Sequence, residues 1–236
     1  MSVLVTGAAG FIGMHVSHAL LDRGETVVGL DDLNDYYDTA LKHARLDTLV
    51  ARPEFRFHRC DVADSEAVEA VFAEHAEIDR VVHLAAQAGV RMSLDDPYRY
   101  VRSNVTGHLA ILEACRRRRR ALRHLVYASS SSVYGANRSL PFSVDDSVDQ
   151  PRSLYAVTKR ADELMSVCYA ELFGVPTTGL RFFTVYGPWG RPDMAVWIFT
   201  DAVLAGAPVR IVRGPIERDF TYIDDITSGV LAAMDR

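Results

Sequence analysis

A tyrosine and a lysine four residues apart, downstream of a run of serines, are the side chains in this sequence best suited to proton chemistry. The segment Tyr155-Ala156-Val157-Thr158-Lys159 places the tyrosine and the lysine on one face of a predicted helix. A free tyrosine has a pKa of about 10 and is a poor base at neutral pH, but a nearby ammonium group favours the phenolate and lowers that pKa. The pair can then act as a general base. The alternative is plain helix surface, because the pattern YxxxK alone is common.

The serines lie where a ligand is expected. The segment Tyr127-Ala128-Ser129-Ser130-Ser131-Ser132-Val133-Tyr134-Gly135 begins at the end of an apolar run over residues 122–128, which predicts a strand. Ligands of parallel sheets bind at the carboxyl ends of the strands. A hydroxyl in this segment can therefore relay a substrate proton to Tyr155.

A glycine-rich segment near the N-terminus predicts a dinucleotide site. It lies between a predicted strand at 3–6 and a predicted helix at 11–23, where glycines let the backbone turn and approach a pyrophosphate at the helix N-terminus. Asp31 follows Gly13 by 18 residues; a spacing of about 20 is expected for a carboxylate that binds the adenosine ribose and repels a 2′-phosphate. NAD is therefore favoured over NADP; the alternative is a glycine turn with an unrelated surface acid. The predicted pyrophosphate contacts are Gly7, Gly10, Phe11, Ile12 and Gly13.

The elements that must position these groups alternate along the chain. Short apolar runs separated by longer helical patterns are typical of βαβ units and a parallel sheet. The runs are continuously apolar, as expected of strands buried on both faces. The fold class is therefore α/β, a Rossmann-type doubly wound parallel sheet. Strands are predicted at 3–6, 27–30, 55–58, 80–84, 122–128 and 177–182, helices at 11–23, 65–75, 104–120 and 152–173, and a polar loop after the second strand, through residue 38.

Composition excludes several classes of protein. The net charge of −5, from 26 basic and 31 acidic residues in a chain of 236, gives no reason to expect a nucleic acid or an anionic membrane as partner. The apolar runs are of strand length, the N-terminus shows no secretory signal, and three scattered cysteines form no metal-binding pattern. We therefore expect a cytoplasmic protein without a metal. The five arginines at 116–120 predict a solvated helix C-terminus, with a nucleic-acid patch as the alternative.

Taken together, the GxxGxxG spacing, the serine run and YxxxK resemble the extended short-chain dehydrogenase/reductase family. The resemblance implies that Ser130, Tyr155 and Lys159 form the catalytic triad, with Tyr155 and Lys159 also touching the cofactor. It implies a supporting position for Asn104 in the same network. Further cofactor contacts are implied at Asp61, Val62, Leu84, Ala85 and Ala86, although Asp61 could instead cap the helix that begins near residue 65.

Within that family the chain resembles nucleotide-sugar epimerases, and most closely UDP-glucuronate 4-epimerases. The segments that carry this resemblance are residues 129–135, 180–194 and 218–225. It implies C4 epimerisation of a UDP-hexuronic acid (UDP-glucuronate to UDP-galacturonate) through a 4-keto intermediate. The substrate contacts that it implies are Arg91, Ser130, Ser131, Ser132, Thr184, Arg191 and Arg218, with surface charge as the alternative for Arg191 and Arg218.

Three alternatives remain open at this stage. UDP-galactose 4-epimerases carry Asn where this chain has Thr184. UDP-glucuronate decarboxylases and 4,6-dehydratases usually carry Glu where Ser132 stands, and the dehydratases also carry Asp where Ser131 stands. A superfamily member that keeps NAD binding as a sensor or scaffold is the non-enzyme alternative, and retention of Ser130, Tyr155 and Lys159 argues against it.

The resemblance also divides the chain. We expect an NAD-binding domain over residues 1–182 and, over 183–236, part of a small substrate-binding domain interleaved with the last sheet elements. Family members usually continue for about a hundred residues beyond Asp235-Arg236, so a truncated chain is expected. The stretch 210–217 matches the family only loosely. A homodimer is implied, paired through the helices near Asn104 and Tyr155.

Overall fold

The computed structural model describes residues 2–209, 211, 214 and 217–236. The loosely matching stretch 210–217 falls largely outside the described residues. The chain forms a six-stranded sheet in the order β3-β2-β1-β4-β5-β6, with every neighbouring pair parallel. This is the doubly wound order, so the predicted fold class is confirmed. The strands are β1 (Ser2–Thr6), β2 (Thr26–Asp31), β3 (Phe55–Arg59), β4 (Ile78–His83), β5 (His124–Ser130) and β6 (Thr177–Phe182).

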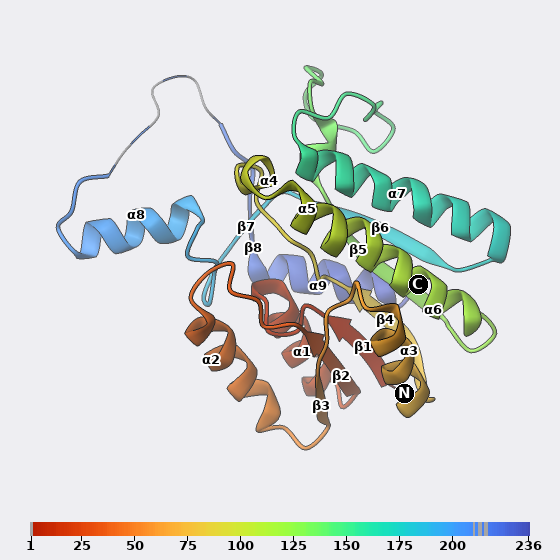
Figure 1. Cartoon of the computed structure of the whole chain (residues 1–236). Coiled ribbons are helices and arrows are strands. Elements are labelled where there is room, and N and C mark those ends of the chain that lie inside the picture. The colour runs from red at the N-terminus through yellow and green to blue at the C-terminus, as the bar shows by residue number, and fades with distance from the viewer. Residues whose placement is uncertain (1, 210, 212–213, 215–216) are drawn as a thin grey trace.

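Helices cover both faces of this sheet (Figure 1). On one face, α1 (Phe11–Asp22), α2 (Thr39–Val50) and α9 (Ile223–Met234) pack against side chains such as Val3 and Val5. On the other face, α3 (Ser65–Glu74), α6 (Gly107–Arg117) and α7 (Leu154–Phe173) pack against side chains such as Leu4. Successive residues of β1 thus face opposite layers, and both layers are apolar, which is why the strands read as continuous apolar runs.

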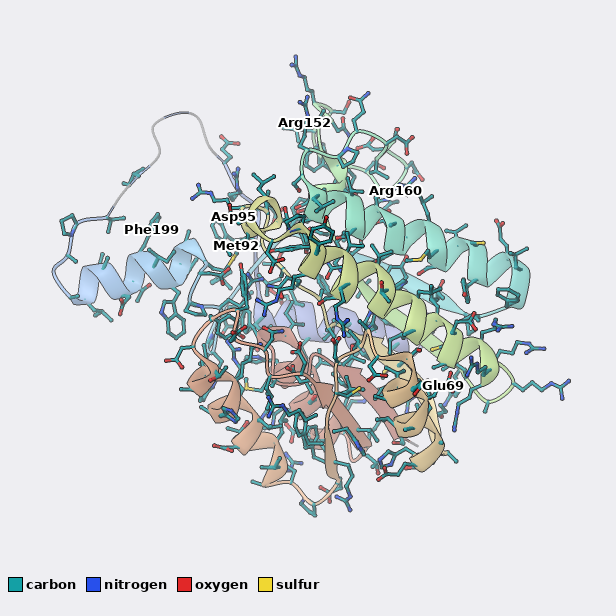
Figure 2. All side chains as sticks on the ribbon, in the orientation of Figure 1. Glu69, Met92, Asp95, Arg152, Arg160 and Phe199 are labelled. Carbon is teal, nitrogen blue, oxygen red and sulfur yellow. The ribbon has the colours of Figure 1, made fainter. Side chains whose placement is uncertain are left out.

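Short elements complete the fold. A segment between β4 and α6 contains α4 (Met92–Asp95), α5 (Pro97–Tyr100) and a π-helical turn, η1 (Val101–Thr106). A 3-10 turn, η2 (Ser131–Tyr134), follows β5. A second sheet pairs β7 (Thr184–Tyr186) with β8 (Phe220–Tyr222), and α8 (Ala195–Leu204), which carries Phe199, stands away from the main sheet (Figures 1 and 2).

Three sequence predictions need correction. The helix predicted at 104–120 is a π-turn followed by α6, which ends at Arg117. The strand predicted at 122–128 runs from His124 to Ser130, so the serines belong partly to the strand itself. After the polar loop comes α2, which was not predicted, because two of its core-facing side chains are the cations Lys42 and Arg45.

The run of arginines at 116–120 lies at the C-terminal end of α6. Arg116 pairs with Glu113 within α6, and Arg117 pairs with Glu69 of α3. The Arg118 guanidinium donates to the backbone carbonyls of Phe72 and Ala76. These side chains stabilise the C-terminal end of α6 and its contact with α3.

None of the described helices combines the length and the apolar character that crossing a membrane requires.

Candidate active site

The largest concentration of predicted site residues lies in one pocket across the carboxyl ends of β1, β4 and β5. Strand order reverses between β1 and β4, which is where dinucleotides bind in this architecture. The pocket walls include the glycine segment, the end of β2, the loop after β4, the end of β5 and the start of α7. The predicted residues in these walls are Gly7, Gly10, Phe11, Ile12, Gly13, Asp31, Asp61, Val62, Leu84, Ala85, Ala86, Ser130, Tyr155, Lys159 and Arg191.

The glycine segment forms a cradle that side chains would fill. Gly7 adopts φ +72°, and a Cβ there would lie 2.9 Å from the Ala85 nitrogen. A Cβ on Gly13 would lie 2.0 Å from the Gly7 carbonyl oxygen. Among the described residues no side chain caps the N-terminus of α1, and the first residues of the helix line the pocket. A pyrophosphate fits this arrangement, because the amides and the helix dipole both favour an anion.

Asp31 is fixed at the end of β2 by two backbone amides. Its Oδ2 accepts from the Ala9 nitrogen at 3.0 Å and its Oδ1 from the Leu33 nitrogen at 2.9 Å. Burial raises the pKa of this carboxyl, while these amides and the Lys42 ammonium oppose the shift. Asp31 is 7% exposed and lines the pocket. A carboxylate at this place fits the adenosine ribose of NAD and excludes a 2′-phosphate.

Tyr155 and Lys159 lie one turn apart on α7 and both face the pocket, as predicted. Lys159 is 3% exposed; its ammonium donates to the Ala128 carbonyl at 3.0 Å and to Asp162 Oδ2 at 3.1 Å. An ammonium has three N–H donors. Two are accounted for within the described residues, which leaves one for a ribose hydroxyl of the cofactor.

Asp162 was not predicted from the sequence. It is 1% exposed, and its Oδ1 has no hydrogen-bond partner among the described residues. Burial raises the pKa of Asp162 to about 6, and the Lys159 ammonium opposes that shift. Asp162 therefore acts on the pocket through Lys159, and does not line it itself.

Asn104 lies behind the pocket wall, in the π-turn η1. Its Oδ1 accepts from the Gln87 nitrogen at 2.8 Å, and its Nδ2 donates to the Gln87 carbonyl at 3.0 Å. Nδ2 also lies 2.9 Å from Oγ1 of Thr158, which donates to the Tyr155 carbonyl. Asn104 thus ties the loop after β4 to the backbone of Tyr155. The implied cofactor contact of Asn104 stays a prediction.

Ser130 is 7% exposed and lines the pocket near Tyr155. Its Oγ accepts from the Ser132 nitrogen at 3.1 Å and so caps η2. The hydroxyl proton remains available to a substrate, which suits the predicted relay. The neighbouring Ser129 instead donates to Glu163 at 2.6 Å, and Arg181 also binds Glu163. That buried cluster holds the end of β5 in place.

Asp61 lies in the loop between β3 and α3. Asp61 lines the pocket, accepts from the Ala63 nitrogen and pairs with Arg102 at 2.8 Å. The side chain that caps α3 is Asp64, which accepts from Ala67, so the alternative of Asp61 as that helix cap is wrong.

The predicted substrate residues are only partly brought together. Arg191 lines the pocket, with Asp193 bound to its guanidinium. Phe183 and Val185 also line it, whereas Thr184 between them does not. The remaining four, Ser131, Ser132, Arg91 and Arg218, lie outside these walls, and the contacts implied for them stay predictions.

Several pocket residues were missed by sequence reasoning. Asn34, Tyr36 and Lys42 line the wall, and the Lys42 ammonium donates to Asn34 Oδ1 at 2.9 Å. Arg45, fully buried, donates to the Trp189 and Gly190 carbonyls and so fixes the segment before Arg191. The only local signal was the helical spacing of Leu46 and Leu49 in a stretch otherwise rich in charge.

Comparisons with known proteins agree with this geometry. The profile of the NAD dependent epimerase/dehydratase family matches residues 3–236. The chain is 51% identical, over its whole length, to UDP-glucuronate 4-epimerase 1 of Arabidopsis thaliana, and spans 55% of that protein. It thus spans about half the length of that curated relative.

Two solved structures are also similar. The crystal structure of UDP-glucuronic acid 4-epimerase from Bacillus cereus with UDP-glucuronic acid and NAD superposes with a TM-score of 0.92, at 38% identity, over 100% of this chain and 74% of that one. UDP-glucose 4-epimerase of Thermotoga maritima gives a TM-score of 0.88 at 31% identity, over 100% of this chain and 74% of that one. With the family profile covering nearly every residue and the glycine cradle, Asp31 and the Tyr155–Lys159 pair in one pocket, the chain belongs to the NAD dependent epimerase/dehydratase family.

Proposed function

We propose that this chain carries the active site of an NAD-dependent nucleotide-sugar 4-epimerase that converts UDP-glucuronate to UDP-galacturonate. The observation that carries the proposal is the single pocket in which the glycine cradle and Asp31 meet Ser130, Tyr155 and Lys159. The similarity to UDP-glucuronate 4-epimerases supports the acidic sugar.

The chain's own residues supply proton transfer at the sugar 4-hydroxyl. Tyr155 as phenolate removes the hydroxyl proton, directly or through Ser130, and later returns it. Lys159 stabilises the phenolate through its positive charge. NAD, held by the glycine cradle and Asp31, would supply the hydride acceptor for C4 oxidation and the donor for reduction of the opposite face. The reaction consumes no net oxidant, so one cofactor molecule serves repeated cycles.

The acidic sugar presents a chemical hazard to such an enzyme. Oxidation at C4 creates a β-keto acid, which loses CO₂ when the carboxylate bond aligns with the carbonyl. Hydroxyl donors from Ser130, Ser131, Ser132 and Thr184 would hold the carboxylate away from that alignment and stabilise its charge. The chain has Ser at 132 and at 131, where Glu and Asp would favour the decarboxylase or dehydratase alternatives.

A neutral UDP-hexose is the second candidate, because the Thermotoga maritima UDP-glucose 4-epimerase also shares the fold. Separate incubations with UDP-glucuronate and UDP-galactose, followed by NMR of the products, distinguish the two. Conversion of UDP-glucuronate with no turnover of UDP-galactose supports our proposal. Turnover of UDP-galactose alone supports the neutral sugar, and no turnover of either, with NAD bound, supports a sensor or scaffold.

We also propose the predicted division and assembly of the chain. Residues 1–182 hold the NAD-binding sheet and 183–236 part of a substrate region, from which α9 returns to pack beside α1. A homodimer through α6 and α7 is favoured because Leu109, Val157, Leu164 and Val167 are 40–55% exposed on these helices. Size-exclusion chromatography with light scattering tests the homodimer, and a monomer would contradict it.

The free thiols of Cys60, Cys115 and Cys168 favour a reducing compartment such as the cytoplasm.

A further inference from the structure

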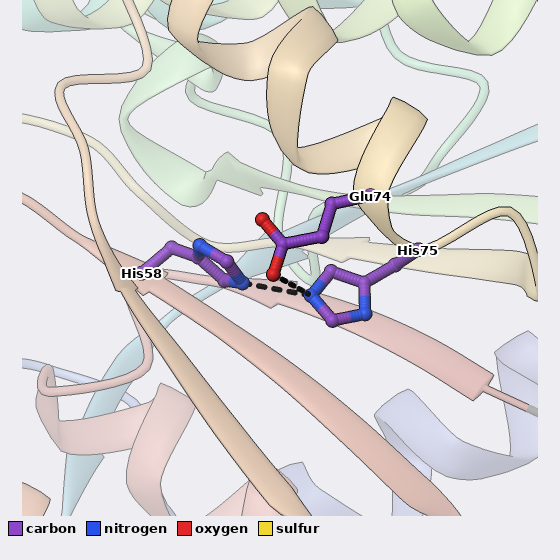
Figure 3. A group of neighbouring side chains, drawn as sticks. All are labelled: His58, Glu74 and His75. Carbon is purple, nitrogen blue, oxygen red and sulfur yellow. Dashed lines mark hydrogen bonds and ion pairs between the residues drawn. The ribbon is translucent and has the colours of Figure 1, made fainter.

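Two histidines and a glutamate form a cluster outside the pocket walls, where β3 meets the C-terminal end of α3 (Figure 3). His58 lies in β3, Glu74 is the last residue of α3, and His75 follows it as the helix C-cap. Figure 3 shows the Glu74 carboxylate and the His58 ring both directed toward the His75 ring.

The distances in the cluster suit a small divalent cation. His58 Nε2 lies 2.8 Å from His75 Nε2, and Glu74 Oε1 lies 3.7 Å from the same His75 nitrogen. All three ligand atoms fall within 4.8 Å of one another. Zinc–nitrogen and zinc–oxygen bonds of about 2.0–2.2 Å place neighbouring ligands of a tetrahedral ion about 3.3–3.5 Å apart. Small side-chain adjustments therefore bring the three atoms onto one face of a tetrahedron.

The mutual orientation of the two histidine rings is compatible with metal binding. At 2.8 Å only one of the two facing Nε2 atoms can carry a proton, because two N–H groups cannot point at each other. The other nitrogen already presents its lone pair. The ring that carries its proton on Nε2 presents that lone pair to a cation once the proton is on Nδ1 instead, so both rings can then bind as neutral imidazoles.

A further carboxylate supports the site from behind. His75 Nδ1 lies 3.4 Å from Glu77 Oε1, on the side of the ring away from His58. Histidines that bind metals commonly donate their second ring N–H to a carboxylate, which fixes the tautomer with a lone pair at the metal-binding nitrogen. Glu74 and Glu77 together also balance the charge of a divalent ion.

We propose that His58, Glu74 and His75 form a Zn²⁺ site, with Glu77 supporting His75, that ties β3 to the end of α3. Two imidazoles and one carboxylate are a common zinc ligand set, whereas Ca²⁺ and Mg²⁺ prefer oxygen ligands alone. A solvent molecule completes the tetrahedron, since Glu74 is on the surface. The site is structural, because its residues lie outside the pocket walls. Sequence spacing gave no sign of it, since His58 and His75 stand 17 positions apart on different elements.

Metal-free protein, prepared with a chelator and kept with a phosphine reductant, is titrated with Zn²⁺ by calorimetry. We expect one equivalent to bind and the thermal unfolding midpoint to rise when Zn²⁺ exceeds its dissociation constant. His75→Gln should abolish binding, Glu74→Gln should weaken it, and Glu77→Gln should weaken it by about tenfold or more. Glu74 and Glu77 are 65% and 56% exposed, so their variants keep the test valid if His75→Gln fails to fold.

Two controls separate this site from adventitious binding. His43→Ala removes an exposed histidine on α2, and Cys168→Ser removes the exposed thiol. Both variants should bind Zn²⁺ as the wild type does. The proposal is overturned if the wild type takes up no Zn²⁺, if the Glu74 and His75 variants bind as tightly as the wild type, or if either control loses the bound ion.

Discussion

The ammonium Nζ of Lys159 lies 3.1 Å from Oδ2 of Asp162, in a pair that is almost wholly buried beneath the candidate active site. Lys159 points from this pair toward the pocket that also holds Tyr155. A negative charge at Asp162 therefore opposes the effect of Lys159 on the tyrosine hydroxyl. The groups around the pair are Glu163 on α7, His83 on β4 and His108 on α6.

We predict that Asp162→Asn shifts the acid limb of the kcat/KM profile to lower pH. The pKa of Asp162 is raised to about 6, so above that pH its charge disfavours the Tyr155 phenolate, and the variant removes that charge. Asp162 follows Tyr155 by seven residues on α7, which is about 10 Å along a helix. A unit charge at about that distance, with an effective dielectric of about 20, shifts the tyrosine pKa by about one unit. Asp149→Asn, on an exposed loop beside Arg160, is the control. Superimposable profiles for Asp162→Asn and wild type would refute this role.

We predict that the protein loses stability on acidification below pH 6.5, in part through His83. Thr6 Oγ1 accepts from the Ala85 nitrogen and forms a hydrogen bond with His83 Nδ1 at 2.7 Å. Burial lowers the pKa of His83 to about 3, so between pH 6.5 and 3 the native state binds fewer protons than the unfolded state. The free energy of unfolding then falls by about 1.4 kcal/mol per pH unit for such a histidine.

Urea unfolding at pH 7 and pH 5.5, for wild type and His83→Asn, measures this slope. The variant should lose less stability between the two pH values, whatever its absolute stability. Asp162 works in the opposite direction below about pH 6, because its raised pKa favours the native state there, so the comparison of slopes isolates His83. Equal slopes would show that His83 is not the responsible group.

We predict that Gly13→Ala destabilises the fold and removes NAD. The added Cβ would lie 2.0 Å from the Gly7 carbonyl oxygen, so the pyrophosphate cradle must distort. Overpacking of this kind typically costs about 1–3 kcal/mol. Gly229→Ala on α9 is the matched control. Apart from the chain neighbours and the local helix backbone, no heavy atom lies within 4 Å of an added Cβ, and a gain of up to about 1 kcal/mol is expected. Calorimetric melting and cofactor content check both, and an undisturbed Gly13→Ala protein would contradict the cradle.

We predict that Asp31→Asn narrows the preference for NAD over NADP. The variant keeps an oxygen for one of the two amides that hold Asp31, but it loses the charge that repels a 2′-phosphate. Titration of both cofactors into wild type and variant gives the ratio of dissociation constants. Asp32→Asn, whose carboxylate binds Asn34 in the same loop, shows whether the effect belongs to Asp31. An unchanged ratio in Asp31→Asn with a changed ratio in Asp32→Asn would transfer the role to Asp32.

Local sequence patterns predicted the strands of the main sheet and the glycine cradle, because these features depend on residues that are neighbours in the sequence. The six strands were found from apolar runs, and the cradle from glycines between a strand and a helix. The α2 helix was not predicted because the buried Arg45 reads as a surface charge, and two of the carbonyls that bind it, at Trp189 and Gly190, are 144 and 145 positions away. Asp162 reads as an ordinary polar helix residue, since its burial at 1% exposure comes from the tertiary fold. A π-turn at 101–106 has no sequence signature of comparable strength.

The measurement that tests the central claim most directly is the product ratio from UDP-glucuronate, followed by NMR with CO₂ release recorded in parallel. Our account predicts UDP-galacturonate with little UDP-pentose. Tyr155→Phe, which keeps the ring but not the ionisable oxygen, should slow turnover by about 10²–10⁴-fold while NAD stays bound. Predominant UDP-pentose from the wild type would contradict the account, as would a Tyr155→Phe protein that keeps more than about a tenth of the activity.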